Sequence, residues 1–369
     1  MKKELVRRWA AVAAGVALLC ALPVVASALP ASVPRLTAGQ LRGRILASAR
    51  MPYAGYAESD ATFGLPALPG LGDVTSLLDG VTRMRVWQAS PRRWRVDVLS
   101  DAGERDTYQL GSRSYIWDSG QELLTEVAGQ PPLRLPRAAD LVPPALALRL
   151  LDEAGQHARF SVIAPLRVAG RSAAGLQMTP ADPASTIGRV DIWAEPGSGL
   201  PLLVEIFGRG SAAPALETQF FQVSPWRADA GVLTPRRGPG TGFTVTSARS
   251  LAGELNSLGL EDLPRRLAGR PRVPLPPAFG GVGVYGGGLS AFVVLGIRGS
   301  RDLVGEALAA GGAVLSLPDG VAALIGAPLV NAVVVRPAGS SLSYLIAGTV
   351  SAPVLERAAV ALTTEDSYP

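Results

Sequence analysis

Helical and strand-like hydrophobic patterns follow each other along roughly the first two thirds of the chain. Leu41, Ile45 and Leu46 have helical spacing and come just after Thr37 and Gln40, which have the spacing of a capping box. Further along, apolar and polar residues alternate with a period of two, as is typical of half-buried strands. This period and the intervening turn residues predict strands over 53–62, 82–89, 94–99, 106–110, 114–117 and 123–127. We expect consecutive strands to pair as an antiparallel meander.

A second helix, predicted over 141–154, separates this meander from another one. Pro143 and Pro144 suit its first turn, and Leu146 and Leu150 lie on its packing face. Strands are predicted to resume over 160–163, 167–168, 174–179, 189–194, 202–208 and 216–223, followed by a helix over 250–259.

Composition changes after this second meander. The segment 264–277 carries four arginines together with Pro271, Pro274 and Pro276, which is typical of an exposed linker. Beyond it lies a smaller unit, 278–364. Its pattern predicts a strand (289–297), a helix (302–310), three strands (314–317, 331–336 and 342–348) and a helix (353–362). This order predicts a small open sheet with one helix on a face.

Residues 1–28 have the composition of an export signal. A basic start precedes an uncharged stretch, and Ala26-Ser27-Ala28 supplies the small residues that a signal peptidase needs, so we expect cleavage after Ala28. The alternative is an uncleaved membrane anchor, because the uncharged stretch from Trp9 to Pro34 is long enough to span a bilayer. In both cases we expect an exported, periplasmic or extracytoplasmic protein.

Composition excludes several kinds of chemistry. One histidine and one cysteine allow no disulfide framework, Cys/His zinc site or Cys–His nucleophile pair within the chain. His157 lies at a helix exit and is interpreted as a surface or capping residue. The net charge is +5, of which residues 1–28 supply +3, and the remaining +2 is weak support for nucleic-acid binding. We expect no enzyme, catalytic residue, metal centre or cofactor.

Two further motifs favour structural interpretations. Gly281 to Gly286 matches GxGxxG, but a dinucleotide site needs a strand before this motif and a helix after it, and here a Pro-rich segment precedes it and a strand-like run follows. Arginine and tryptophan alternate from Arg83 to Arg95, a pattern also found in single-strand binders. Period-two alternation explains it as a half-buried hairpin with an arginine face in solvent, which suits an anionic membrane surface or an acidic protein partner better than nucleic acid. The carboxylates of Glu104 and Asp106 are interpreted as surface charges.

The remaining candidate site is apolar. Phe63, Leu65, Leu68 and Leu71 lie in a loop that is buried on the protein's own core, covers a cavity or contacts a membrane. With the apolar strand faces, this loop allows a cavity for acyl chains, in which each buried methylene contributes about 0.8 kcal/mol. The predicted lining residues are Met84, Val86, Trp94, Val96, Val98, Ile192, Val204, Ile206 and Phe220.

The order of helices and meanders resembles a known bacterial superfamily. It is that of the lipoprotein carriers LolA and LolB and the sigma-E regulator RseB, also called MucB. The phrase RVDIWAEP at 189–196, continuing through GLPL at 199–202 to Phe220, is similar to a hairpin of that superfamily. Residues 284–294 (VYGGGLSAFVV) and 347–359 (AGTVSAPVLERAA) resemble the opening strand and the closing strand and helix of the RseB C-terminal domain.

This resemblance implies an α+β protein with two domains. Residues 37–260 would form a half-open antiparallel β-barrel wrapped round helices with a lipid cavity, and 278–364 an RseB-type C-terminal domain. Two-domain members of the family sense lipid or mislocalised envelope components and bind the outward part of a membrane anti-sigma factor, whereas one-domain members carry lipoproteins. We therefore expect an exported, non-enzymatic lipid-sensing regulator. Its expected partners are a lipid or acylated envelope component, an anti-sigma factor and the membrane surface. The alternative is a lipid or lipoprotein carrier of the cell envelope.

Overall fold

The computed structural model describes most of the chain. The described residues are 31–64, 76–100, 103–129, 136–227, 229–235, 238, 240–247, 263–275, 282–299 and 302–364. Three sequence predictions lie outside them: the signal or anchor over 1–28, the loop positions Leu65, Leu68 and Leu71, and the helix over 250–259. Within the described ranges, no helix is both long enough and apolar enough to cross a membrane.

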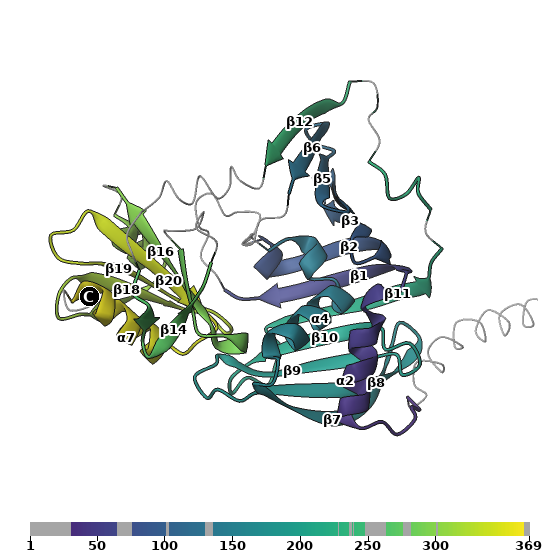
Figure 1. The fold of residues 1–369 in the computed structure, drawn as a ribbon, viewed down its shortest axis with the longest axis horizontal. Coiled ribbons are helices and arrows are strands. Elements are labelled where there is room, and N and C mark those ends of the chain that lie inside the picture. The colour runs from purple at the N-terminus through teal and green to yellow at the C-terminus, as the bar shows by residue number, and fades with distance from the viewer. Residues whose placement is uncertain are drawn as a thin grey trace, which may run out of the picture.

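The larger part of the chain forms one open sheet of twelve strands (Figure 1). The strands are β1 (Tyr53–Thr62), β2 (Asp79–Ser90), β3 (Arg93–Ser100), β4 (Gly103–Leu110), β5 (Arg113–Asp118), β6 (Leu123–Ala128), β7 (Ala158–Val168), β8 (Arg171–Pro180), β9 (Ile187–Ala194), β10 (Pro201–Gly208), β11 (Leu216–Pro225) and β12 (Gly242–Ser247). Their order across the sheet is β12-β6-β5-β4-β3-β2-β1-β11-β10-β9-β8-β7, so the edge strands β12 and β7 do not pair with each other.

The predicted meanders are confirmed, with two differences. Strands β1 to β6 pair consecutively and antiparallel, as do β7 to β11, and β1 joins the two runs by pairing with β11. The two short strands predicted over 160–163 and 167–168 are one strand, β7, with an irregular register between Ile163 and Leu166. Strand β12 is absent from the sequence prediction, and it pairs parallel with β6.

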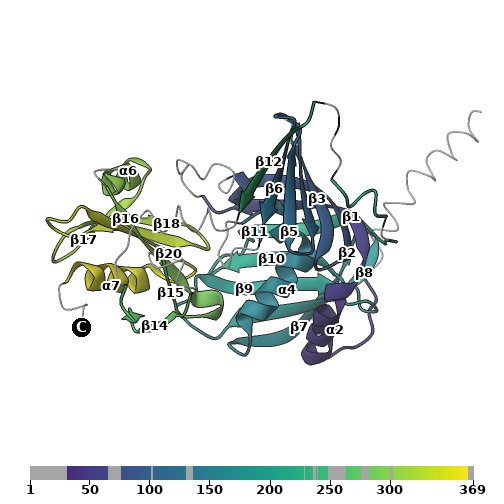
Figure 2. The ribbon, with the colours of Figure 1, turned by 45° about the horizontal axis from the view of Figure 1, so that its top comes forward.

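Two helices cover one face of this sheet (Figures 1 and 2). Helix α2 (Ala38–Ala47) begins at the predicted capping box, in which the Gln40 N–H donates to Thr37 Oγ1 at 3.2 Å and the Thr37 N–H donates to Gln40 Oε1 at 2.9 Å. Leu41 and Ile45 of this helix are fully buried, but Leu46 is 41% exposed because it lies about 100° round the helix from Ile45. Helix α4 (Pro143–Ala154) starts with the predicted proline pair and packs on β10 and β11.

The C-terminal part forms a second, eight-stranded sheet (Figure 2). Its strands are β13 (Arg266–Leu267), β14 (Arg270–Val273), β15 (Val282–Tyr285), β16 (Phe292–Arg298), β17 (Ala313–Ser316), β18 (Val321–Gly326), β19 (Asn331–Arg336) and β20 (Leu342–Gly348). Helix α7 (Ala352–Thr363) packs in one core with Val333 and Val335, and α6 (Leu303–Ala309) packs in another with Val334. Because neighbouring strand residues point to opposite faces, this sheet has a helix on each face rather than the one predicted.

The predicted Pro/Arg-rich linker is wrong for residues 266–273, which form the hairpin β13–β14 on the edge of the second sheet. Leu267 is buried in the core beside α7, and Gly269 supplies the positive φ of +79° that the turn requires. The Arg272 guanidinium donates to the carbonyls of Leu263 and Val282. The prolines and arginines suggested a linker, but these residues form a short hairpin at the edge of the sheet. Edge positions of a sheet tolerate proline.

The two sheets contact each other through the turn that precedes β9. Ser185 forms an isolated bridge with Val350, and its hydroxyl donates to the Leu289 carbonyl at 2.7 Å. Nearby, Asp182 accepts hydrogen bonds at 2.7 Å from Arg270 of β14 and from the Ser290 hydroxyl. Burial alone would raise the pKa of Asp182, but these hydrogen bonds outweigh burial and hold the pKa below its usual value.

Replacement of Arg270 by alanine is expected to weaken this contact between the sheets. The variant leaves Asp182 without its charged partner, which costs about 2 kcal/mol. Amide exchange at Thr186 and Ser351, whose N–H groups donate to carbonyls across the interface, should quicken by about 30-fold if both bonds open together. Arg266→Ala is the matched control, because Arg266 is exposed and its guanidinium donates to the Gly269 carbonyl of its own turn. Equal exchange rates in the two variants would contradict the assignment.

Candidate functional site

The predicted lining residues all lie on the sheet face that α2 and α4 cover. Seven of them are buried members of one core cluster, and Trp94 and Val98 are partly buried against that cluster. The strand parity that placed them together is therefore correct. Met84, Ile192 and Val204 are fully buried and belong to the same core cluster as the helix residues Leu41 and Leu151. Most of the predicted set is thus packed interior, while Val86, Trp94 and Val96 border a cleft.

That space is a cleft of about 280 Å³ between β2, β3 and the start of α4. Strand-side residues and residues of the segment 137–148 line it from opposite sides. The lining residues are Ala49, Tyr53, Val86, Gln88, Pro91, Trp94, Val96, Arg137, Ala139, Asp140, Val142, Pro144, Ala145 and Leu148. Its wall is mostly apolar, with a few polar groups, which is the usual make-up of a small-ligand pocket.

Polar groups of the cleft are held in place by local contacts. The Arg137 guanidinium lies 4.9 Å from the centre of the Trp94 ring, and the Arg137 N–H donates to the Asp140 carboxylate at 3.0 Å. The Tyr53 hydroxyl donates to Gln88 Oε1 at 3.3 Å. Sequence reasoning missed Arg137 and Asp140. The only feature of the sequence that pointed to them was their position just before a predicted helix. Local pattern does not show which strands these two residues face.

Of the predicted cavity loop, only Phe63 is described. Its side chain is 7% exposed and packs in the core cluster, and its backbone N–H donates to the Leu78 carbonyl. The position of Phe63 therefore agrees with the first of the three alternatives, a loop buried on the protein's own core.

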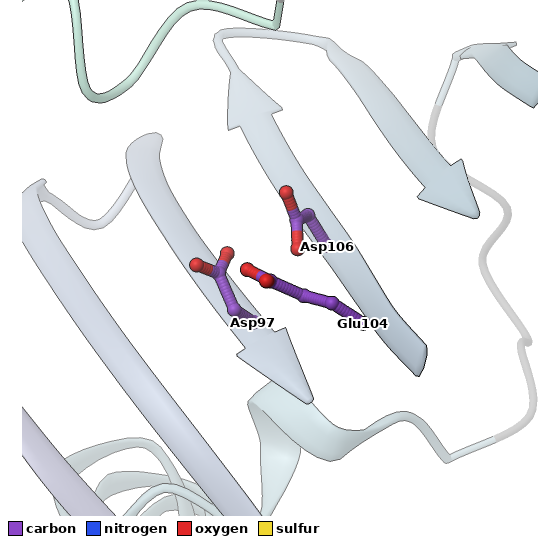
Figure 3. A group of neighbouring side chains, drawn as sticks. All are labelled: Asp97, Glu104 and Asp106. Carbon is purple, nitrogen blue, oxygen red and sulfur yellow. The ribbon is translucent and has the colours of Figure 1, made fainter. Parts of the chain in front are cut away.

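The opposite face of the sheet carries a charged cluster that the sequence interpretation misjudged. Asp97 of β3 and Asp106 of β4, which lie opposite each other, are only 1% and 3% exposed (Figure 3). The Arg95 guanidinium pairs with Asp97 at 2.5 Å, with Asp106 at 2.8 Å and with Glu104 at 3.6 Å. The predicted solvent-exposed arginine face is therefore wrong at Arg95 and Asp97, and Asp106 is not a surface charge.

A remote segment lies next to Arg95 and Asp106 of this cluster. Residues of 229–235 lie over the face, where Leu233 is fully buried and the Val232 carbonyl accepts from Arg95 at 3.4 Å. Between segment and sheet is a cavity of about 490 Å³, lined by Arg95, Asp106, Tyr108, Trp117, Leu124, Asp229, Gly231, Val232, Thr234 and Pro235. The alternation of strand residues puts Asp97, Glu104 and Asp106 on one face. No local sequence pattern indicates that the segment 229–235 lies over that face.

Burial shapes the electrostatics of the cluster. It raises the pKa of both Asp97 and Asp106 above the usual carboxyl range, and the Arg95 guanidinium offsets this only in part. Arg95 also lies between two aromatic rings, 5.2 Å from the Trp87 ring centre and 4.9 Å from that of Tyr108. An arginine so fully engaged is poorly placed to bind a nucleic-acid phosphate.

Further along the same face, acidic residues oppose each other across strands. Glu205 of β10 lies opposite Glu217 of β11 and Asp191 of β9, and Arg189 pairs with Asp191. Burial first, and then the charges of Glu217 and Asp191, raise the pKa of Glu205 to about 7. Like charges directly opposite each other destabilise a sheet.

Glu205→Gln is expected to stabilise the protein at alkaline pH. The folded-state pKa lies above the unfolded value, so the folded state binds the extra proton and loses stability as pH rises from about 4.5 to about 7. After discounting for solvent screening, the loss is about 1–2 kcal/mol. Urea unfolding of the variant at pH 8 should show this gain and a flatter pH profile. Glu153→Gln, at an exposed helix position, should leave both unchanged.

Two motifs with possible catalytic or nucleotide-binding roles lie in structural positions. His157 is exposed just after α4, and its N–H donates to the Ala154 carbonyl, as expected for a residue at a helix exit. Gly283 lies inside β15, paired with Val294, so the central part of the motif is a strand rather than the loop before a helix. The dinucleotide interpretation is thereby excluded.

These features describe an α+β protein, with helices on an open, mainly antiparallel sheet and a second sheet beside it. No family model and no curated protein matches the chain. Among solved structures it is similar to MucB in a complex of MucB with MucA(peri), at 17% identity and a TM-score of 0.49, over 88% of this chain and 97% of MucB. The structure of Pseudomonas aeruginosa MucA/MucB gives the same values.

A LolA superfamily protein from Nitrosomonas europaea is similar at 11% identity and a TM-score of 0.26, over 55% of this chain and 99% of that one. MucB and a LolA superfamily protein, which belong to the superfamily that the sequence motifs resemble, are both among the solved structures to which the chain is similar.

Proposed function

We propose that the chain is an exported, non-enzymatic regulator that senses lipid. An acyl chain of a lipid or acylated envelope component would bind in the cleft beside α4, and the outward part of a membrane anti-sigma factor would bind the protein. The partner follows from the resemblance of the sequence to the two-domain RseB/MucB family. The observation that supports a lipid ligand is the cleft itself.

The cleft suits one apolar chain with a polar end. Its volume of about 280 Å³ is near the lower limit for small-molecule pockets, so it fits one short chain or part of a longer one. Ala145, Leu148 and Val96 offer apolar contact, at about 0.8 kcal/mol per buried methylene. Arg137 supplies a cation suited to a carboxylate or phosphate head group.

The fold around the cleft fits the half-open barrel expected over 37–260. In this proposal the twelve-stranded sheet wraps round α2 and α4 and stays open between β12 and β7. The smaller domain over 278–364, with the hairpin β13–β14 added at its edge, is the second unit.

Helix α4 connects the cleft to the second sheet, so it could transmit the effect of ligand binding. Its N-terminal half lines the cleft through Pro144, Ala145 and Leu148. Its C-terminal end contacts the 3₁₀ turn Gly288–Ser290, where a Cβ on Gly288 would lie 3.1 Å from the Glu153 carbonyl. A small shift of α4 on ligand binding would therefore change the packing of the second sheet, which is how a sensor transmits occupancy.

Absence of catalysis is part of the proposal. The single histidine is exposed at a helix end, and the buried carboxylates of Asp97 and Asp106 are held by an arginine. Paired in this way, they are poor general bases.

The test compares two tryptophan substitutions on α4. Leu148→Trp places a large ring in the cleft, and Arg149→Trp places the same ring on the exposed neighbouring position. Binding of palmitate by the full chain, followed with a fluorescent analogue, should weaken at least about tenfold in Leu148→Trp and stay unchanged in Arg149→Trp. Equal binding by both variants, or no saturable binding by the parent chain, would reject the cleft as the lipid site.

A carrier is the alternative function, and vesicle transfer separates it from a regulator. A carrier moves a labelled lipid from donor to acceptor vesicles in proportion to protein concentration. A regulator binds the outward segment of a membrane anti-sigma factor from its own genome, and it does so with an affinity that changes when lipid is added. Transfer without any such affinity would favour the carrier and reject the regulator.

A further inference from the structure

Three carboxylates converge on the outer face of the larger sheet (Figure 3). Asp97 and Asp106 lie opposite each other on β3 and β4, and Glu104 comes two residues before Asp106, on the same face. One oxygen from each of the three lies within 4.8 Å of the others. Such a set of oxygen ligands is the kind that hard divalent cations prefer.

The charges within this group do not balance. Arg95 is the cation that pairs with all three carboxylates, which leaves an excess of two negative charges when every carboxyl is ionised. Arg85 lies opposite Asp97 on β2, but its side chain is exposed. Since Asp97 and Asp106 are almost fully buried, their excess charge is costly unless something else compensates it.

A second observation shows a ligand position that is not used by the protein. Asp106 Oδ1 is buried without a hydrogen-bond partner, although the residue is only 3% exposed. The bonds from Arg95 go to Asp97 Oδ1 and Asp106 Oδ2, so each aspartate keeps a second oxygen. Asp106 lines the cavity of about 490 Å³ under the segment 229–235, which has room for a cation and its waters.

We propose that Asp97, Glu104 and Asp106 bind a divalent cation, Ca²⁺ in preference to Mg²⁺. With the cation in place, three carboxylates, Arg95 and the metal sum to zero charge. Ca²⁺ is favoured because it accepts irregular arrangements of carboxylates and water, whereas Mg²⁺ demands a regular octahedron. Asp229, at the wall of the same cavity, adds negative charge at its edge. The proposed site is separate from the acyl cleft, and it differs from the sequence-based expectation of no metal centre.

Terbium luminescence tests the site in the full chain. After treatment with a chelator, Tb³⁺ is titrated as a Ca²⁺ substitute, and excitation of tryptophan should give saturable terbium emission because Trp117 lines the cavity. Ca²⁺ should displace Tb³⁺ at lower concentration than Mg²⁺ does. Calorimetric titration with CaCl₂ alone should give about one site per chain.

Three variants assign the site. Asp106→Asn removes the unpartnered oxygen's charge, and Glu104→Gln changes a carboxylate that is 39% exposed, so folding is preserved even if the buried substitution is not tolerated. Each should weaken Ca²⁺ binding at least about tenfold, because affinity follows ligand charge. Asp79→Asn, an exposed carboxylate on β2, should leave binding unchanged. No saturable Tb³⁺ or Ca²⁺ binding, or equal binding by Glu104→Gln and the parent chain, would overturn the proposal.

Discussion

Replacement of Arg95 by methionine should lower the free energy of unfolding by about 3–5 kcal/mol at pH 7.5. Methionine keeps an unbranched apolar stem between the rings of Trp87 and Tyr108, so the loss reports the missing charge rather than a cavity. Without the guanidinium, Asp97 and Asp106 remain buried and opposite each other with no cation between them. The measurement is urea unfolding in the presence of a chelator, so that no bound metal replaces the lost charge.

The control for this substitution is Arg83→Met on the neighbouring strand. Arg83 is 55% exposed and its pair with Glu58 is 3.7 Å long, so the control should change stability by no more than about 0.5 kcal/mol. Adding CaCl₂ should restore part of the stability of the Arg95 variant, because the proposed cation binds the same carboxylates. A loss below about 1 kcal/mol without metal would show that the carboxyl groups are neutral in the folded protein.

Local pattern predicted most of the elements of this fold. Thr37 and Gln40 form the capping box that their spacing indicated, and β1, β19 and β20 have the predicted bounds. Alternation also assigned faces correctly, since Met84 and Val86 are buried while Arg83 and Arg85 are exposed. These features depend on neighbours within one turn or one hairpin, and such neighbours are visible in a sequence.

The features that local pattern missed depend on remote contacts. Asp106 looks like a surface charge on an alternating strand, but it is buried and lines a cavity together with residues of the remote segment 229–235. Strand β12 joins the sheet by parallel pairing with β6, from which it is separated by more than a hundred residues. The cleft likewise needs the placement of 137–148 over β2 and β3, which no short-range pattern contains.

The face of the sheet to which a side chain points and the presence of free space beside that side chain are different properties, as the candidate site shows. The predicted lining residues share one face because alternation determines direction, and that part of the prediction is correct. Whether a face borders a cleft depends on how completely the helices fill it. Leu41, Ile45 and Leu151 of the helices belong to the same buried core as Met84, Ile192 and Val204, while the cleft remains next to Trp94.

Phe220→Ala should separate these two roles of the same face. Phe220 is 1% exposed and packs edge to face on Tyr53 with ring centres 5.8 Å apart, so its truncation is expected to cost about 3–5 kcal/mol. Trp94→Ala should cost less, because Trp94 is only partly buried, yet it should weaken palmitate binding since Trp94 lines the cleft. Urea unfolding and the binding assay on both variants give the comparison.

The opposite pattern would change the view of the interior. If Phe220→Ala cost less than about 1 kcal/mol and weakened palmitate binding more than Trp94→Ala did, the packing around Phe220 would be loose enough for a ligand to enter. The acyl chain would then reach from the cleft into the centre of the sheet, against residues such as Ile206 and Val204. The expected pattern instead limits the ligand to the border of β2, β3 and α4, because the rest of the face is already occupied by the protein's own side chains.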